Sequence, residues 1–144
     1  MKIGFDIDGV IADQNLMDLC AINNMDKQRK LYYQIRMPQL NPYLFATMDD
    51  EIHFITARTK DLTEITLNWC KKFFPGITVH ITEIESWKSL LEWDKWIKEV
   101  ARRKASIINR LDLDVYFEDI PNVVYKLRKL CLHTKIIQYG GRLK

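Results

Sequence analysis

Two aspartates follow the first apolar segment of the chain and give it its clearest chemical signal. Residues 2–5 run directly into Asp6-Ile7-Asp8-Gly9. Alternate residues of a strand share one face, so Asp6 and Asp8 are predicted to point the same way where the strand ends. Neighbouring carboxylates repel each other unless a cation lies between them, and Gly9 permits a sharp turn. The pattern indicates an Mg²⁺ and phosphate site, although an ordinary strand with an Asp-Gly turn explains the same residues.

Other polar groups follow, or lie close to, two later apolar segments. Thr56-Ala57-Arg58 ends the segment 51–56, and Glu118-Asp119 ends the segment 113–117. Lys104 lies upstream of the latter, at the expected start of a short helix. Ligands bind outside the carboxyl ends of parallel strands, so these groups are expected to meet Asp6 there. Carboxylates suit Mg²⁺, while lysine and hydroxyl donors offset phosphoryl charge. Taken singly, each has a simpler explanation as a strand-end hydroxyl, a surface charge or a helix cap.

Strands and helices alternate along the chain, which predicts an α/β fold. We expect a Rossmann-like three-layer sandwich with a mostly parallel five-stranded sheet. The expected strands are residues 2–8, 51–56, 77–81, 113–117 and 135–138. The expected helices are 13–37 with a break near 23–26, 43–48, 61–74 capped by Asp61, 83–103 and 121–132.

The chain of 144 residues is expected to form a single domain, 1–144, with residues 11–50 as a small helical cap inserted after the first strand. This segment is much longer than a typical strand-to-helix connection. It contains Tyr32 and Arg36 as candidate substrate-binding residues. An aromatic ring can stack on a base and an arginine can meet a second anionic group; packing of the cap onto the body is the alternative. Gly9, Ala57 and Arg58 are further candidates.

The composition is that of an ordinary globular protein, with 47% hydrophobic and 28% charged residues. No apolar run approaches the roughly 20 residues of a membrane span, and acidic residues interrupt the beginning of the chain where a secretory signal would be apolar. Three scattered cysteines favour a reduced, cytoplasmic protein. The net charge of +3 is compatible with an anionic substrate without requiring one, and the oligomeric state is not predicted.

Four segments in order resemble the motifs of the haloacid dehalogenase (HAD) superfamily of phosphohydrolases. They are Asp6-Ile7-Asp8-Gly9-Val10, Phe54-Ile55-Thr56-Ala57-Arg58, Lys104 and Tyr116-Phe117-Glu118-Asp119. Thr56-Ala57-Arg58 followed by Thr66 to Trp69 resembles the small nucleotidase-like branch, which includes 5′(3′)-deoxyribonucleotidases, and the similarity is loose beyond the catalytic motifs. One departure concerns the fourth motif, because the family often has two aspartates or Gly-Asp where this chain has Glu118-Asp119.

The resemblance implies a role for each matched residue. Asp6 would be the nucleophile that forms an aspartyl-phosphate, and Asp8 the general acid and then base. Thr56 would hold a phosphoryl oxygen, and Lys104 would pair with Asp6 and the phosphoryl group. The metal ligands would be Asp6, Asp8 through its backbone carbonyl, Asp119, and Glu118 either directly or through water.

The expected function is therefore an Mg²⁺-dependent phosphomonoesterase that acts on a small phosphorylated substrate, expected to be a nucleotide. A 3′-phosphatase acting on nucleic-acid ends is the nearest alternative, and a catalytically silent phosphate-binding protein is another. A phosphoreceiver domain takes its phosphoacceptor from a later strand than the acidic pair. Here the third strand ends in His80-Ile81-Thr82, without an aspartate, which counts against that class.

Overall fold

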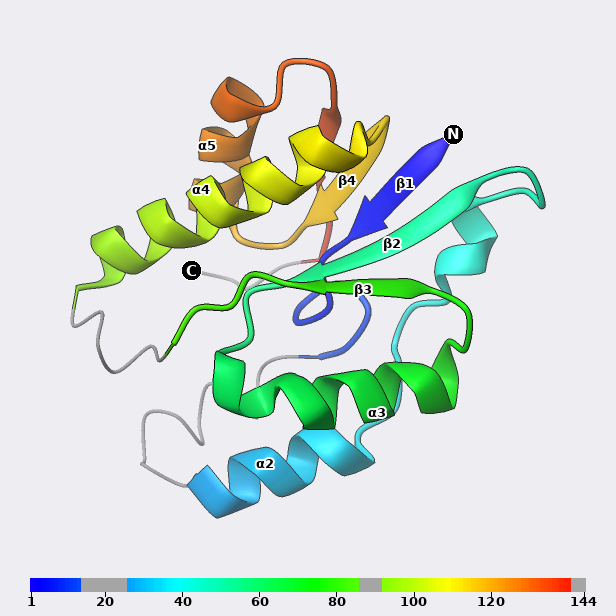
Figure 1. The fold of residues 1–144 in the computed structure, drawn as a ribbon, viewed down its shortest axis with the longest axis vertical. Helices are drawn as coiled ribbons and strands as arrows, with labels where there is room; N and C mark the ends of the chain where they lie inside the picture. Colours follow the sequence, from blue (N-terminus) through cyan, green and yellow to red (C-terminus); the bar gives the residue numbers. More distant parts are fainter. Residues whose placement is uncertain (14–25, 86–91, 141–144) are drawn as a thin grey trace.

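A five-stranded sheet with helices on both faces forms the body of the protein in a computed structural model, which describes residues 1–13, 26–85 and 92–140 (Figure 1). The strand order is β3-β2-β1-β4-β5, and every neighbouring pair is parallel. The strands are β1 (Lys2–Phe5), β2 (Glu51–Thr56), β3 (Thr78–Ile81), β4 (Val115–Glu118) and β5 (Lys135–Gln138). This confirms the predicted Rossmann-like α/β class.

The helices form two layers that enclose the sheet. Helices α2 (Asp26–Ile35) and α3 (Thr63–Phe73) lie side by side on one face, and α4 (Trp93–Leu111) and α5 (Pro121–Leu130) cover the other (Figure 1). Two short 3₁₀ helices, η1 (Pro42–Phe45) and η2 (Lys60–Leu62), precede β2 and α3. The chain builds outward from β1 to β3 and then returns to the other side of β1 with β4. The carboxyl ends of β1 and β4 therefore flank the crevice where such sheets bind ligands.

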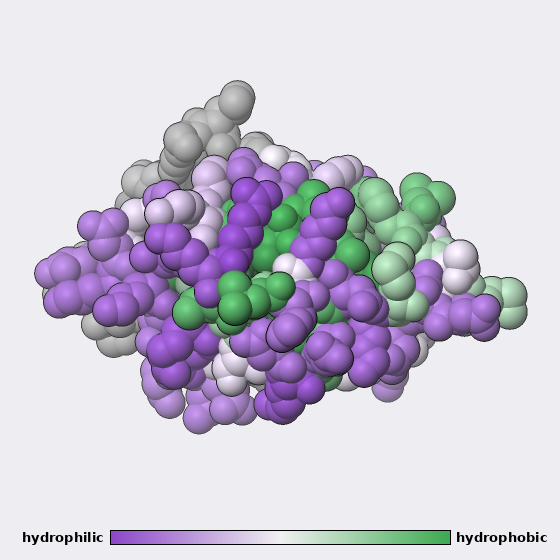
Figure 2. Space-filling model, turned by 90° about the horizontal axis from the view of Figure 1, so that it is seen from above, coloured by the Kyte–Doolittle hydropathy of each residue, from purple (hydrophilic) through white to green (hydrophobic). Residues whose placement is uncertain are grey.

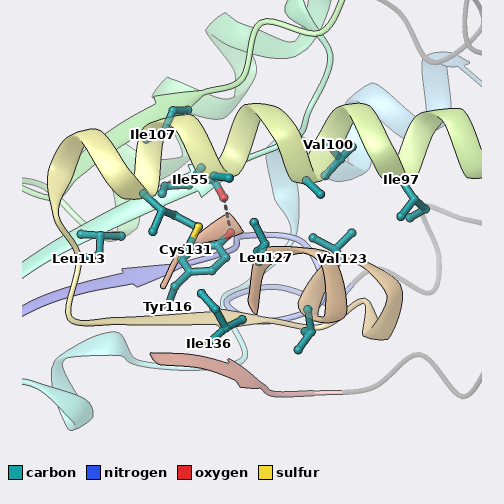
Figure 3. Close-up of a cluster of buried hydrophobic side chains, with 14 of the residues drawn as sticks. Ile55, Ile97, Val100, Ile107, Leu113, Tyr116, Val123, Leu127, Cys131 and Ile136 are labelled. Carbon is teal, nitrogen blue, oxygen red and sulfur yellow. Dashed lines mark hydrogen bonds between the residues drawn. The ribbon is translucent and has the colours of Figure 1, made fainter. Parts of the chain in front are cut away.

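Apolar side chains fill the space on each face of the sheet. Between the sheet and helices α4 and α5, Ile55, Tyr116 and Leu127 are fully buried (Figure 3). The Tyr116 hydroxyl donates a hydrogen bond of 3.5 Å to the Ile55 carbonyl. On the opposite face the rings of Phe5 and Phe117 are stacked, with centroids 4.8 Å apart. These residues precede the acidic ends of β1 and β4, so the packing on both faces fixes where those ends lie.

Three local predictions are wrong. Strand β1 ends at Phe5, because the Ile7 carbonyl accepts hydrogen bonds from Ile11 and Ala12 and closes a tight turn. Lys104 lies well inside the long helix α4 and does not begin a short helix.

Asp61 does not cap helix α3. It lies within η2 and accepts a hydrogen bond from the Thr59 hydroxyl, while α3 begins after Leu62 without a side-chain cap.

Part of the predicted cap, and part of the predicted helix 83–103 with its three tryptophans Trp87, Trp93 and Trp96, lies outside the described residues. In the segment 11–50 the structure describes α2 and η1, whereas the first half of the predicted helix 13–37 falls in residues 14–25. In the segment 83–103 it describes α4 from Trp93 onward, and Trp87 lies in the gap.

The surface is hydrophilic over most of the face seen from above, where apolar side chains gather near the middle and toward one end (Figure 2). Among the helices that the structure describes, none has both the length and the apolar character needed to cross a membrane.

Candidate active site

Three buried carboxylates meet at the carboxyl ends of β1 and β4. Asp6, Glu118 and Asp119 each offer an oxygen, and these oxygens lie within 4.8 Å of one another. Asp6 is 5% exposed, and Glu118 and Asp119 are fully buried. The Asp6 amide donates to the Phe117 carbonyl at 2.9 Å, so the pairing of β1 with β4 continues into the cluster. The sheet itself thus brings together carboxylates that are more than 100 residues apart.

Lys104 is the cation of this cluster. Its Nζ lies 3.0 Å from Asp6 Oδ1 and 2.7 Å from Glu118 Oε2, and the residue is 1% exposed. It extends from the middle of α4, two helical turns from the end of that helix. Burial alone would lower the pKa of Lys104, but Asp6 and Glu118 outweigh this effect and raise that pKa well above its ordinary value. The lysine therefore keeps its positive charge at neutral pH.

The pKa values of Asp6 and Glu118 shift in opposite directions although both residues touch Lys104. Burial and the nearby charge of Glu118 raise the pKa of Asp6 well above its ordinary value. Burial also opposes the charge on Glu118, but Lys104, together with hydrogen bonds that include one from Asp6, keeps the pKa of Glu118 below its ordinary value. Without a metal ion, Asp6 thus keeps its proton more readily and Glu118 keeps the negative charge.

Asp8 points to a different set of charges. The Arg58 guanidinium binds it through two nitrogens, with Nε 2.9 Å from Oδ2 and Nη2 2.8 Å from Oδ1. Arg36 Nη2 also donates to Asp8 Oδ1. Both arginines are 5% exposed. The two aspartates of the first motif consequently have separate partners, one a lysine and the other a pair of arginines.

The arginines are themselves held in place by α2 and α3. Arg58 Nη1 donates to the Thr66 hydroxyl at 3.0 Å, and Trp69 Nε1 donates to the Arg36 carbonyl at 2.8 Å. The Tyr33 ring lies against both guanidinium groups, 4.2 Å from that of Arg58 and 4.9 Å from that of Arg36. These contacts fix the guanidinium groups and, through them, Asp8.

The other residues predicted for the site make contacts of their own. The Thr56 hydroxyl accepts a hydrogen bond of 3.1 Å from the Arg58 amide at the buried end of β2, and the intervening Ala57 packs at the edge of the core. Gly9 has φ +91°, and a Cβ there would overlap the Asp119 carboxylate. Tyr32 is half-buried and packs against Tyr33 and Leu62.

Some contacts of the site were not expected from the sequence. Arg36 and Arg58 were predicted as substrate-binding residues, but their contact with Asp8 was not foreseen, and neither were the supporting contacts of Tyr33, Thr66 and Trp69. No local sequence pattern predicts these contacts, since Arg36 and Arg58 are 28 and 50 residues from Asp8. The feature of the sequence that pointed to these contacts was the presence of two arginines near the predicted site.

The donor set suits a hard divalent cation such as Mg²⁺. Three carboxylates face one ammonium, which leaves two uncompensated negative charges when all three are ionised. Oxygen ligands are those that Mg²⁺ prefers. A divalent cation would remove the repulsion that favours protonation of Asp6. The residues present therefore fit the predicted ion.

Comparison with known proteins identifies the fold. The sequence matches no model of a known protein family and no curated protein. The fold is similar to that of a chain in the structure of the Pnkp1/Rnl/Hen1 RNA repair complex, with a TM-score of 0.66 and 11% identity over 99% of this chain. A chain in a second structure of the Pnkp1/Rnl/Hen1 complex gives a TM-score of 0.55 and 13% identity, again over 99% of this chain. This chain spans 43% and 47% of the length of those two chains.

Proposed function

We propose that this chain is an Mg²⁺-dependent phosphomonoesterase of the HAD type, with Asp6 as its nucleophile. The observation that carries the proposal is the contact of Lys104 with Asp6 at 3.0 Å inside the buried cluster of Asp6, Glu118 and Asp119. A carboxylate nucleophile must approach a phosphoryl group of the same charge sign. A lysine and a divalent cation beside it remove that obstacle.

Asp6 and Asp119 are the residues best placed to hold Mg²⁺, with Glu118 behind them. Glu118 already accepts hydrogen bonds from Lys104 at 2.7 Å and from the Asp119 amide at 3.2 Å, so we assign it to orienting its neighbours or to an indirect contact. When bound, Mg²⁺ supplies positive charge to the phosphoryl oxygens.

In the first step, a carboxylate oxygen of Asp6 forms a bond to phosphorus while the bond from phosphorus to the ester oxygen breaks. The departing oxygen takes a proton from Asp8. Lys104, beside Asp6, and the Thr56 hydroxyl, at the end of β2, offset charge on the phosphoryl oxygens. The product of this step is an aspartyl-phosphate on Asp6 and a free alcohol.

In the second step, water attacks phosphorus and transfers a proton to Asp8. The bond between phosphorus and the Asp6 oxygen breaks, and inorganic phosphate leaves. Asp8 has then regained the proton that it gave up in the first step, and Asp6 is again a free carboxylate. One acid and base residue therefore serves both steps.

Arg58 and Arg36 orient Asp8 for this proton transfer. The carboxylate accepts three hydrogen bonds from the two guanidinium groups. An oxygen that carries a proton accepts fewer hydrogen bonds than an ionised one, so protonation of Asp8 must loosen at least one of these contacts. Arg36 shares Oδ1 with Arg58, which makes its contact the one that can be given up while Arg58 still holds the carboxylate.

A nucleotide leaving group is supported by exposed aromatic rings near the cluster. The rings of Phe45 and Tyr139 have centroids 6.3 Å apart and are 40% and 36% exposed. The Tyr139 amide donates to the Glu118 carbonyl at 2.9 Å, next to Asp119. Exposed aromatic faces stack on bases of any sequence.

A 3′-phosphatase acting on nucleic-acid ends is the second candidate. It is favoured by the likeness in fold to chains of an RNA repair complex and by the same aromatic pair, which would serve a terminal base as well as a free nucleotide.

The experiment compares phosphate release by the wild type and Asp6→Asn from p-nitrophenyl phosphate, 5′- and 3′-mononucleotides, and 3′-phosphorylated oligonucleotides. We expect Mg²⁺-dependent release that EDTA and Asp6→Asn both abolish. A higher kcat/KM for the oligonucleotides, with a steep salt dependence, would identify the end-processing activity. Equal release by the wild type and Asp6→Asn contradicts the proposal. Failure of the wild type on every substrate favours a silent phosphate-binding protein.

A further inference from the structure

Two of the three histidines of the chain lie side by side on β2 and the edge strand β3. His53 Nδ1, on β2, is 3.1 Å from His80 Nε2, on β3, and the ring centroids are 5.2 Å apart. The parallel pairing of the strands fixes their positions, since His53 lies opposite Thr78 and His80 lies opposite Ile55. The pair lies on β2 and β3, whereas the carboxylate cluster forms at the ends of β1 and β4. The proposed reaction does not use it.

The separation of the two nitrogens is that of two ligands on one metal ion. Zn²⁺ binds imidazole nitrogens at about 2.0–2.1 Å, so two of them at a tetrahedral angle are roughly 3.3 Å apart. The observed 3.1 Å is close to this value. The two nitrogens are hydrogen-bonded to each other without an ion, so to bind one the rings must turn until both nitrogens face it. The two strands therefore supply most of the required geometry before any ion binds.

The protonation of the pair also suits a metal. Burial lowers the pKa of both His53 and His80, and the two rings oppose each other's charge. Both rings are thus neutral near pH 7. One of the two facing nitrogens carries the hydrogen of the bond between the rings, and exchange of that hydrogen through water to the other nitrogen of the same ring leaves both facing nitrogens with a lone pair and both rings neutral. Both residues are half-buried, so an ion and its water ligands can reach them.

Charged residues around the two histidines limit their affinity for a metal ion. Glu51, two residues before His53 on the same face of β2, favours a cation. Lys2, on β1, and Arg110, on α4, oppose one. Two imidazoles with mixed neighbours favour a borderline ion of the Zn²⁺, Ni²⁺ or Cu²⁺ class over Mg²⁺, which prefers oxygen.

We propose that His53 and His80 form a second metal site, a two-histidine chelate for Zn²⁺ that links β2 to β3 and is independent of the carboxylate cluster. Water molecules complete the coordination. Because the ion binds two neighbouring strands of the folded sheet, it stabilises the folded protein.

The test is a Zn²⁺ titration by calorimetry in excess Mg²⁺, which competes at the carboxylates. The proteins are the wild type, His53→Gln, His80→Gln and the control His133→Gln, which removes the exposed third histidine. We expect one Zn²⁺ per wild-type chain and a higher melting temperature with zinc. Either strand variant should weaken binding by at least about tenfold, because it loses one of two nitrogen ligands, and His133→Gln should bind like the wild type.

Imidazole NMR of the wild type gives a second measurement that needs no variant. Zinc should shift the ring signals of His53 and His80 and leave those of His133 unchanged, and the effect should fade as acid protonates the rings. Absence of zinc binding by the wild type, or equal binding by all four proteins, would overturn the proposal. Zinc shifts confined to residues of the carboxylate cluster would overturn it as well.

Discussion

Arg58 binds Asp8 through two parallel contacts, Nε to Oδ2 at 2.9 Å and Nη2 to Oδ1 at 2.8 Å. The second aspartate of the opening motif is therefore oriented by a residue that follows β2. Arg36, which follows α2, makes a further contact with the same carboxylate. Through Arg36, the segment between β1 and β2 thus contacts Asp8 in the catalytic centre of the proposed reaction. Asp6, in contrast, is held by the pairing of β1 with β4 and by Lys104 of α4.

Replacing Arg58 with lysine should reduce kcat more than it raises KM. Lysine keeps the charge but cannot form the two parallel hydrogen bonds, and a misplaced acid of this kind costs up to about 100-fold in rate. Steady-state kinetics with p-nitrophenyl phosphate measures the effect. Arg102→Lys is the control, because Arg102 pairs with Glu99 on the exposed face of α4. An Arg58→Lys enzyme with wild-type kcat would show that Asp8 needs no such orientation.

Lys104→Met should destabilise the protein strongly. Removing one partner of a buried ion pair costs about 3–5 kcal/mol, because the other charge stays buried without compensation. Urea unfolding at neutral pH with EDTA measures the loss. Lys95→Met is the matched control on the same helix; Lys95 lies 3.5 Å from Glu92 at the surface, and its loss should cost less than about 1 kcal/mol.

The double variant Lys104→Met with Glu118→Gln should recover part of the loss, because the buried negative charge is then gone. Equal stability of Lys104→Met and the wild type would mean that the lysine does not balance the carboxylates.

The pH dependence of stability should report on Asp6. In the metal-free protein, burial and Glu118 raise the pKa of Asp6 above its pKa in the unfolded chain. Between these two pKa values, the folded protein keeps a proton on Asp6 that the unfolded chain has lost. The contribution of Asp6 to stability is therefore full at low pH and is lost as the pH rises through the folded pKa. Melting curves in EDTA should show a decline with pH that is weaker in Asp6→Asn. A decline of the same slope in both proteins would contradict the raised pKa.

Mg²⁺ should reverse the decline of stability with rising pH. Mg²⁺ favours ionised Asp6, so it should bind more tightly as the pH rises and should release protons on binding. Calorimetry in two buffers of different ionisation enthalpy measures the released protons. No Mg²⁺ binding at any pH, in a folded protein, would contradict the assignment of the carboxylate cluster as a metal site.

Gly9→Ala should impair both folding and metal binding. Gly9 has φ +91°, and its new Cβ would overlap the Asp119 carboxylate. Gly76→Ala is a close control, because Gly76 has φ +93° but no atom within 4 Å of a Cβ. That variant should lose only the roughly 1–2 kcal/mol of a left-handed backbone. Unfolding and Mg²⁺ titrations of both variants separate the two effects; equal Mg²⁺ affinity in both would mean that Asp119 can move aside.

Much of the fold could be predicted from the sequence because its signals are local. Apolar runs such as Ile52 to Ile55 and the Pro75-Gly76 break mark strands and helix ends without reference to distant residues. Their alternation then favours a parallel sheet. Boundaries were less predictable. The end of β1 depends on a turn in which Ile7 accepts two hydrogen bonds, and the apolar pattern continues through that turn to Ile11.

The meeting of Asp6 with Glu118 and Asp119 was predictable, since topology brings the ends of parallel strands together. The position of Lys104 in its helix was not, because the broad apolar pattern of residues 83–103 hides a helix that continues to Leu111. The partners of Asp8 were also out of reach. They depend on how α2 packs against α3, and only that packing brings Arg36 and Arg58 to the same carboxylate.

The most direct test of the central claim is to find the phosphoryl group on Asp6. The protein is mixed with p-nitrophenyl phosphate and Mg²⁺, quenched in acid within one turnover, and digested for mass spectrometry. We predict a phosphoryl group on the peptide that contains Asp6, and none in Asp6→Asn or without Mg²⁺. Hydrolysis that proceeds with the phosphoryl group on another residue, or undiminished in Asp6→Asn, would contradict the assignment of Asp6 as the nucleophile.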